Sequence, residues 1–339
     1  MARTVKIESV SPSAAISGGD ILIRGQGFDP SKHVRPRVKF GDREGSVVVA
    51  AADFLLARVP DGATHGQIRI AADGMESAPY PFSLGVQIAD SLHPVANPAI
   101  DRQGNIYATF SGARGQKVPV SVYRIDPSYR VKPFVTEMMN PTGLAFSSDG
   151  YLHVSSRFDG TIYRIDPEGH STVFAEGMGV ATGIAFDRHG FLYVGDRSGT
   201  LFKIGPDRKT FVFATLEPSI AAYHLAFNAE GDLFVTGPTT SSYDAIYRVT
   251  PAGEVSRFYR GLGRPQGLAF DKAGNLYVAA SLAGRRGIVC LTPNAKAELV
   301  VSGPGVVGMA FLPNRRLILA TNSALFHLDW NVEGLPLLS

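Results

Sequence analysis

Apolar and polar residues alternate along most of the chain in one recurring pattern. From residue 95 onward, a short apolar segment is followed by a polar turn and then by an aromatic segment. Alternation of this kind, bounded by Gly and Pro, is typical of half-buried β-strands. We therefore predict a strand, a turn and a second strand in each copy. The copies cover residues 95–108, 141–154, 181–194, 222–235, 265–278 and 306–319.

A second motif follows each copy and supplies further strands. Examples are IYRIDP at 162–167 and IYRVTP at 246–251. The proline has no N–H for continued strand pairing, so we expect the ladder to end there. Short segments such as STVFAEG then provide a fourth strand. Four strands in roughly 40 residues, repeated six times, predict a six-bladed β-propeller over residues 86–339.

The two ends of this repeat are expected to meet. We predict that VQIA at 86–89 pairs near the last blade, which we expect to end in GLPLLS at 334–339. Pairing of this kind would join the two ends of the propeller and lock the ring against opening.

Residues 1–85 lack the repeat and form a second unit. Strand-like segments alternate there with Gly, Pro and Asp turns, which suggests a small immunoglobulin-like β-sandwich. The segments SPSAAISGGDILIRGQGF, VKFGD and VPDGATHGQIRIAADG resemble the TIG/IPT domain over almost the whole unit. We thus expect an all-β protein with two domains, residues 1–85 and residues 86–339.

Composition narrows the class of protein. The chain has 33 Lys and Arg against 30 Asp and Glu, and a net charge of +3 gives no general attraction to nucleic acid or an anionic membrane. The single cysteine excludes an internal disulfide. No apolar run approaches the roughly 20 residues of a membrane helix. The first residues lack the apolar core of a signal peptide.

Localisation depends on whether Met1 is the native start. If it is, we expect a cytoplasmic protein. If Met1 replaces a signal that was removed, we expect an exported one, as the resemblance to bacterial proteins with a TIG domain and a propeller implies.

The repeat region resembles the NHL and gluconolactonase-like (senescence-marker) propeller families over residues 86–339. These propellers host lactonases, lyases, sensors and binding modules, so the resemblance implies a fold more than an activity. In the metal-dependent lactonases of the family, residues at the start of the inner strands hold a divalent cation. The corresponding positions here are Ala96, Thr142, Thr182, Tyr223, Gln266 and Val307, with Asn97 in place of a glycine.

This ring of residues contains no carboxylate. A hard cation such as Ca²⁺ needs several oxygen ligands, usually with carboxylates among them. We therefore predict no metal ligands and a polar channel lined with water. The alternative is a calcium site in which Thr142, Thr182, Gln266 and Asn97 supply neutral oxygens.

Arginines are concentrated in the loops that follow the second strands. These loops and the starts of the inner strands share one face of a propeller, which predicts Arg114, Arg157, Arg197 and Arg285 on that face. Arginine offers bidentate hydrogen bonds to carboxylate and phosphate groups. The alternative is that these arginines pair with neighbouring aspartates in solvent, where each pair contributes little. Binding of single-stranded RNA is disfavoured because the net charge is nearly neutral.

Two functions fit these features. The first is a non-catalytic module whose arginine-rich face, with Phe158 and Tyr243, binds a carbohydrate, an acidic ligand or a protein partner. The second, implied by resemblance, is a lactonase-like or lyase-like enzyme at the channel mouth, where His224 or His93 would move protons. We expect His153 to be packed in the core, because other copies hold Tyr or Phe at its position.

Overall fold

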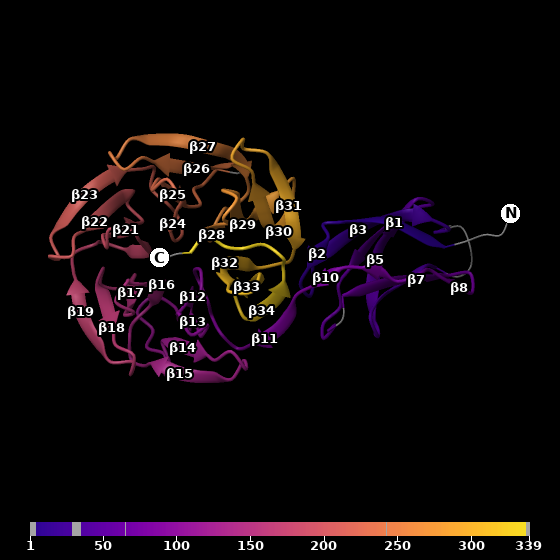
Figure 1. Ribbon diagram of the computed structural model, residues 1–339, viewed down its shortest axis with the longest axis horizontal. Coiled ribbons are helices and arrows are strands. Elements are labelled where there is room, and N and C mark those ends of the chain that lie inside the picture. The colour runs from indigo at the N-terminus through magenta and orange to yellow at the C-terminus, as the bar shows by residue number, and fades with distance from the viewer. Residues whose placement is uncertain (1–4, 29–34, 65, 242, 337–339) are drawn as a thin grey trace.

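The computed structural model describes residues 5–28, 35–64, 66–241 and 243–336. Every regular element in these ranges is a β-strand, and none of the described residues forms a helix that is long and apolar enough to cross a membrane. Figure 1 shows a ring of sheets around a central axis, with an N-terminal sheet beside the ring. The fold is all-β and propeller-like.

The N-terminal sheet is built from residues before position 86. Its strand order is β1-β3-β6-β5-β4-β7-β8, and β9 pairs with β7. Ile21, Val38 and Ile68 belong to a hydrophobic cluster that is confined to this part of the chain. The strands are β1 Lys6–Ser11, β3 Asp20–Gln26, β4 Arg37–Phe40, β5 Arg43–Ala50, β6 Phe54–Arg58, β7 Gln67–Ala72, β8 Met75–Glu76 and β9 Tyr80–Pro81.

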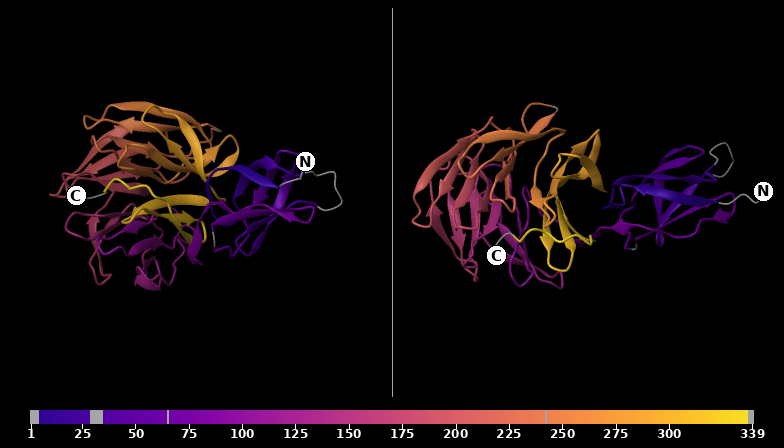
Figure 2. Two further views of the ribbon diagram at one scale, coloured as in Figure 1. Left: turned by 45° about the vertical axis from the view of Figure 1, so that its right-hand side comes forward. Right: turned by 45° about the horizontal axis from the view of Figure 1, so that its top comes forward.

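Four sheets of the ring have four strands each and follow one another in the chain. Their first strands lie nearest the channel, and their last strands lie at the outside (Figures 1 and 2). The strands are β12 Ala99–Ile100, β13 Ile106–Thr109, β14 Val122–Ile125, β15 Val131–Val135, β16 Pro141–Phe146, β17 Leu152–Ser156, β18 Ile162–Ile165, β19 Ser171–Ala175, β20 Ala181–Phe186, β21 Leu192–Asp196, β22 Thr200–Ile204, β23 Thr210–Thr215, β24 His224–Phe227, β25 Leu233–Thr236, β26 Asp244–Val249 and β27 Val255–Leu262.

The remaining two sheets of the ring contain strands from the N-terminal part of the chain. One has the order β10-β2-β31-β30-β29-β28, and the other has the order β11-β34-β33-β32. The strands are β2 Ala14–Ala15, β10 Ser83–Leu84, β11 Val86–Ala89, β28 Leu268–Phe270, β29 Leu276–Leu282, β30 Arg285–Leu291, β31 Ala297–Ser302, β32 Val306–Leu312, β33 Arg316–Thr321 and β34 Leu325–Asp329.

The two ends of the repeat meet in one sheet. β11 pairs antiparallel with β34, and Val86 lies opposite His327. The predicted pairing of VQIA with the last sheet is therefore confirmed. Because strands from both ends of the repeat share one ladder, the ring cannot open at this point without breaking that ladder.

The prediction that GLPLLS ends the last sheet is wrong. β34 ends before it, and Asn331 takes a positive φ of 56°, which turns the chain away from the sheet. The chain then reaches the neighbouring sheet, where the N–H of Leu335 donates to the carbonyl of Phe270 at 2.9 Å. Residues 337–339 of this segment lie outside the described residues.

The recurring turn between first and second strands is organised by a carboxylate. After β20, Asp187 Oδ1 accepts the N–H groups of His189 and Phe191, both at 2.9 Å. The Tyr193 hydroxyl donates to Asp187 Oδ2 at 3.3 Å. Gly190 has a φ of +81°, a conformation that side chains disfavour. The motif AFDRHGFLYV thus encodes one self-bonded turn.

Neighbouring sheets of the ring pack through aromatic edges. Phe146 in β16 meets Tyr107 of the preceding sheet with ring centroids 5.2 Å apart and an interplanar angle of 72°. Edge-to-face pairs contribute about 0.5–1.5 kcal/mol beyond the area they bury. The same contact recurs as His153–Phe186, Tyr193–Phe227, Phe234–Phe270 and Tyr277–Phe311.

The predicted core position of His153 is confirmed. Its ring lies 4.8 Å from Phe174 and 4.9 Å from Phe186, and the residue is 2% exposed. Its Nε2 has no hydrogen-bond partner among the described residues. Burial lowers the pKa of His153 to about 4, so the imidazole is neutral at pH 7.

We predict that His153→Phe makes the protein less sensitive to acid. The unfolded chain protonates a histidine near pH 6.5, whereas the folded protein keeps His153 neutral until about pH 4. Stability from this group is therefore lost as the pH falls from about 6.5 toward 4, by about 2 kcal/mol between pH 7 and pH 5. Urea unfolding at both pH values should show a smaller difference for the variant than for the wild type.

The matched control is His189→Gln, which changes an exposed histidine and should keep the wild-type difference. Equal pH dependence in His153→Phe and the wild type would contradict the prediction.

Candidate functional site

A large cavity follows the central channel. Its volume is about 1580 Å³. At one end it is lined by Asn97, Gly143 and His224. At the other end it reaches the turns between first and second strands, where Arg102 and Arg188 lie at its rim. The cavity is large enough for a small organic ligand.

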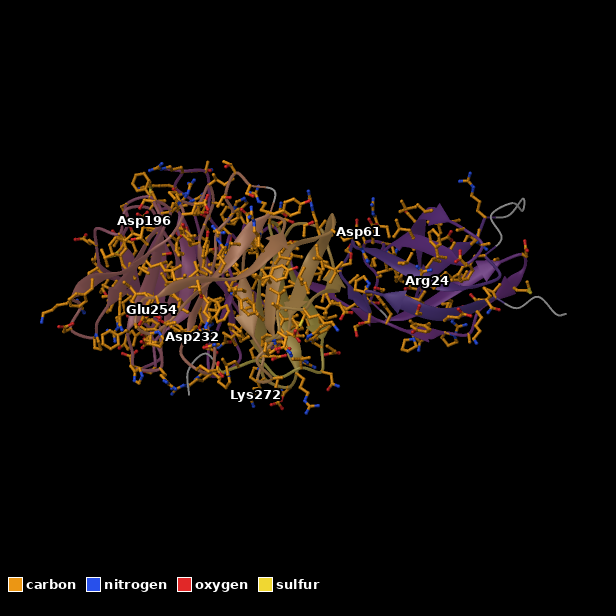
Figure 3. The ribbon with its side chains drawn as sticks, turned by 90° about the horizontal axis from the view of Figure 1, so that it is seen from above. Arg24, Asp61, Asp196, Asp232, Glu254 and Lys272 are labelled. Atoms are coloured by element: carbon orange, nitrogen blue, oxygen red, sulfur yellow. The ribbon has the colours of Figure 1, made fainter. Side chains whose placement is uncertain are left out.

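The cavity rim and the arginine-rich loops lie on opposite faces of the ring. Figure 3 views the ring from the side, with Asp196 at the end of β21 on one face and Lys272, after β28, on the other. Lys272 lines the cavity, and Asp196 does not. The sequence did not predict this rim. Polar side chains occur in every turn between first and second strands, so their presence does not mark any one turn as part of a binding site.

Three residues of the predicted ring are sealed inside the protein. Thr142, Thr182 and Tyr223 are each 1% exposed. Thr182 Oγ1 donates to the Gly195 carbonyl at 2.9 Å and accepts the N–H of Tyr223 at 3.0 Å. Thr142 Oγ1 donates to the carbonyl two residues earlier at 3.2 Å, and the Tyr223 hydroxyl donates to the Glu217 carbonyl. These oxygens stabilise the closed end of the channel.

Asn97 ties separate sheets together at the same end. Its Nδ2 donates to the Leu268 carbonyl at 2.8 Å, and its Oδ1 accepts the N–H of Met309 at 3.0 Å. A β-carbon at Gly267 would lie 2.1 Å from Asn97 Oδ1, so a side chain is excluded there. Gln266 is half-buried beside this glycine, and its carbonyl accepts a hydroxyl hydrogen bond at 2.5 Å. The inner strands therefore converge until one end of the channel is closed.

This ring does not fit the divalent cation that the family resemblance implies. The side-chain oxygens of Thr142, Thr182 and Asn97 are already engaged within the protein. In the part of the chain that the structure describes, no group of three or more His, Cys, Asp or Glu residues could hold a metal ion. To bind a cation, these oxygens would have to give up their hydrogen bonds within the protein. As neutral ligands they would still leave the charge of the ion uncompensated.

Two of the predicted arginines, Arg114 and Arg197, lie close enough to Arg157 to affect its guanidinium. Burial lowers the pKa of the Arg157 guanidinium, and the charges of Arg197 and Arg114 lower this pKa further. Arg157 Nη2 donates to the Gly112 carbonyl at 2.8 Å, and Arg197 Nη2 donates to the Ile220 carbonyl at 2.6 Å. Arg157 Nε is buried and has no partner among the described residues. We call Arg114, Arg157 and Arg197 the arginine cluster.

The aspartates near the arginine cluster are engaged elsewhere. Asp159 Oδ2 accepts the Tyr163 hydroxyl at 3.1 Å, and Asp196 Oδ1 accepts the N–H of Val180 at 2.8 Å. Asp244 Oδ1 bonds to the loop around residue 239. No ion pair between described residues includes a member of the arginine cluster. The alternative, in which these arginines pair with neighbouring aspartates in solvent, is therefore not observed for the described members of the arginine cluster.

Arg285 is positioned at the junction with the N-terminal sheet. Its Nη2 donates to the Ser11 carbonyl at 3.0 Å and lies 3.5 Å from the Asp20 carbonyl. In the same region β2 pairs in parallel with β31. The sequence suggested a ligand contact for Arg285, whereas these bonds connect the two parts of the chain.

The two candidate histidines differ in their surroundings. His93 is exposed and lies 6.2 Å from Phe110, measured between ring centroids. His224 is 4% exposed and lines the closed end of the channel cavity. Burial lowers the pKa of His224 to about 4. The structure thus separates these residues and gives only His224 a buried environment.

No family model and no curated protein matches this chain. Solved structures do match it. A gluconolactonase from Xanthomonas campestris has 16% identity and a TM-score of 0.60 over 73% of this chain and 89% of that chain. An auxiliary nutrient binding protein from Bacteroides thetaiotaomicron has 14% identity and a TM-score of 0.56 over 97% and 98%. A streptogramin B lyase has 12% identity and a TM-score of 0.53 over 94% and 93%. These similarities establish the propeller-like fold and leave both binding and enzymatic functions open.

We predict that Arg285→Ala weakens the junction between the N-terminal sheet and the ring. The change leaves the Ser11 carbonyl without its charged donor, which should cost about 1–2 kcal/mol of unfolding free energy. Urea unfolding measures the effect. The neighbouring Arg286 is exposed and serves as control, because Arg286→Ala should change stability by less than about 0.5 kcal/mol. Equal effects of the two substitutions would remove the proposed role of Arg285.

Proposed function

We propose that this protein is a binding module whose arginine cluster recognises an acidic ligand, in particular an acidic carbohydrate. The observation that carries the proposal is the electrostatic imbalance at Arg114, Arg157 and Arg197. The charges of Arg114 and Arg197 act on the Arg157 guanidinium there, and no described carboxylate forms an ion pair with these three residues. A carboxylate or phosphate group would supply the missing charge.

Partial burial of Arg157 makes this position favourable for an anion. Its guanidinium is held by the Gly112 carbonyl, and the buried Nε is left without a partner. A buried cation without a counter-charge is costly, so the approach of an anion would offset part of that cost. Arg114 is exposed and free to contact the same ligand from solvent.

Exposed apolar side chains lie in the loops of the same face. Phe158 is 45% exposed, Ile220 is 50% exposed and Tyr243 is 63% exposed. Aromatic rings next to arginines provide flat surfaces that suit sugar rings or a partner protein. Their contribution supports a ligand larger than a simple inorganic anion.

We also infer a division into an immunoglobulin-like TIG/IPT sandwich at residues 1–85 and a six-bladed propeller at residues 86–339. The sandwich is supported by β5, which pairs with β4 through one half and with β6 through the other, so that two strand groups share one core. Six blades follow if β28–β31 form a blade to which β2 and β10 are added.

We predict that the double variant Arg157→Ala and Arg197→Ala binds oligogalacturonate at least about 100-fold more weakly than the wild type. Two charge-assisted hydrogen bonds are removed, each contributing about 1.5–3 kcal/mol. Isothermal titration calorimetry measures the loss. Binding by the wild type should weaken with added salt, and the fully methyl-esterified oligomer, which carries no charge, should bind poorly.

The charge-matched control is Arg130→Ala with Arg208→Ala, which removes two exposed arginines from turns outside the arginine cluster. This control should keep wild-type affinity. Unchanged binding in the Arg157 and Arg197 double variant, or equal affinity for charged and esterified oligomers, argues against the proposal.

A lactonase-like or lyase-like enzyme is the second candidate function. The neutral imidazole of His224 favours it, because a neutral histidine can accept a proton. Its pKa of about 4 makes it a weak base at pH 7, which is why the binding module is preferred. We expect the protein not to hydrolyse glucono-lactone. The metal content of the same preparation is measured in parallel. Turnover that is lost in His224→Leu would reverse this preference.

A further inference from the structure

His224 interrupts a repeated glycine position at the closed end of the channel. The corresponding residues of other inner strands include Gly143, Gly183, Gly267 and Gly308. At Gly183 a β-carbon would lie 2.3 Å from the carbonyl oxygen of Tyr223, so the inner strands leave almost no space for a side chain at that point. The imidazole of His224 is nevertheless accommodated there, where it borders the cavity.

The imidazole has no internal partner. His224 is 4% exposed, and its ring forms no hydrogen bond or ion pair with any described residue. The other polar side chain at this end, Asn97, is satisfied by Leu268 and Met309. Unlike Nε2 of His153, neither ring nitrogen of His224 is among the fully buried side-chain atoms that lack a partner, so the imidazole nitrogens reach the cavity. His224 is therefore available to a molecule inside the channel.

The walls near His224 are apolar. Leu144, Ile184 and Leu225 line this part of the cavity. The charged lining residues, among them Arg102 and Arg188, belong to the far end, beside the turns. A charged group next to His224 would lose its hydration without gaining an opposite charge.

We propose that the channel is a second ligand site, which extends to the turn face and holds an uncharged, mostly apolar organic molecule by a hydrogen bond between its hydroxyl or carbonyl group and the imidazole of His224. The site is independent of the arginine cluster: no member of the cluster lines the cavity, and Arg197 directly follows Asp196, which lies on the other face (Figure 3). The cavity volume of about 1580 Å³ accommodates such a molecule with its polar group at the closed end.

Burial keeps the imidazole in the form that this ligand needs. The pKa of His224 is lowered to about 4, so at pH 7 the ring offers one N–H donor and one nitrogen acceptor. A hydroxyl can use either nitrogen, and a carbonyl can accept from the N–H.

The test compares two probes that differ by one hydroxyl group. 2-Naphthol and naphthalene are titrated into the full chain at pH 7, and free ligand is measured by equilibrium dialysis. We expect 2-naphthol to bind the wild type about tenfold more tightly than naphthalene, as one buried hydrogen bond allows. In His224→Leu this preference should fall to nearly one while naphthalene binding is retained. His224→Gln, which keeps hydrogen-bonding groups, should retain part of the preference.

His153→Phe is the matched control, because it removes a second buried histidine that does not line the cavity. It should keep the tenfold preference for 2-naphthol. The Arg157 and Arg197 double variant should keep it as well, so that failure of the channel proposal can be told apart from failure of the proposal for the arginine cluster. If His224→Leu does not fold, the imidazole resonances of the wild type should still reach half of their shift at an about tenfold lower concentration of 2-naphthol than of naphthalene. A channel that binds neither probe and holds solvent only, or a preference unchanged in folded His224→Leu, would overturn the proposal.

Discussion

The contact that organises the ring is the edge-to-face packing between a phenylalanine of one inner strand and a ring in the second strand of the preceding sheet. Tyr107–Phe146 at 5.2 Å is one instance, and four neighbouring joints use the same geometry. The contact fixes the distance between sheets. At the remaining joint, Ile100 and Ile318 belong to one hydrophobic cluster. The antiparallel pairing of β11 with β34 supports the ring in that region.

This regular spacing has a consequence for the channel. The inner strands approach so closely at the loop face that Gly143 and Gly183 cannot carry side chains, and Asn97 crosses between sheets. The channel is consequently closed at the end where a lactonase-type metal ring was considered. Two different surfaces result: a charged loop face with the arginine cluster, and a cavity that extends to the turn face.

Two histidines illustrate how position within the repeat decides the role of a residue. His153 replaces an aromatic residue of the second strand and packs between Phe174 and Phe186. His224 replaces a glycine of the inner strand and borders the cavity. Burial lowers both pKa values to about 4. Only His224 can meet a ligand, because only its site adjoins space.

Much of the architecture is determined by local sequence. The alternation of apolar and polar residues specifies the strands, and the recurring turns with Asp, Gly and Tyr specify where they end, because these features act over a few residues. The period of the repeat then gives the order of the strands. The core position of His153 followed from the same alignment. What the alignment could not supply was which polar groups find partners. Arg285 was grouped with the loop arginines, yet its bonds to Ser11 and Asp20 join segments that are 274 and 265 residues apart.

The same limit applies to the candidate site. Sequence alone determined that Thr142, Thr182 and Tyr223 stand at the starts of inner strands. Only the tertiary structure decided that their oxygens are consumed by neighbouring sheets, that the nearby aspartates leave the arginine cluster unpaired, and that the cavity extends to the opposite face. The physical reason is that strand formation depends on nearby residues, whereas burial, hydrogen-bond partners and charge balance depend on groups brought together from distant parts of the chain.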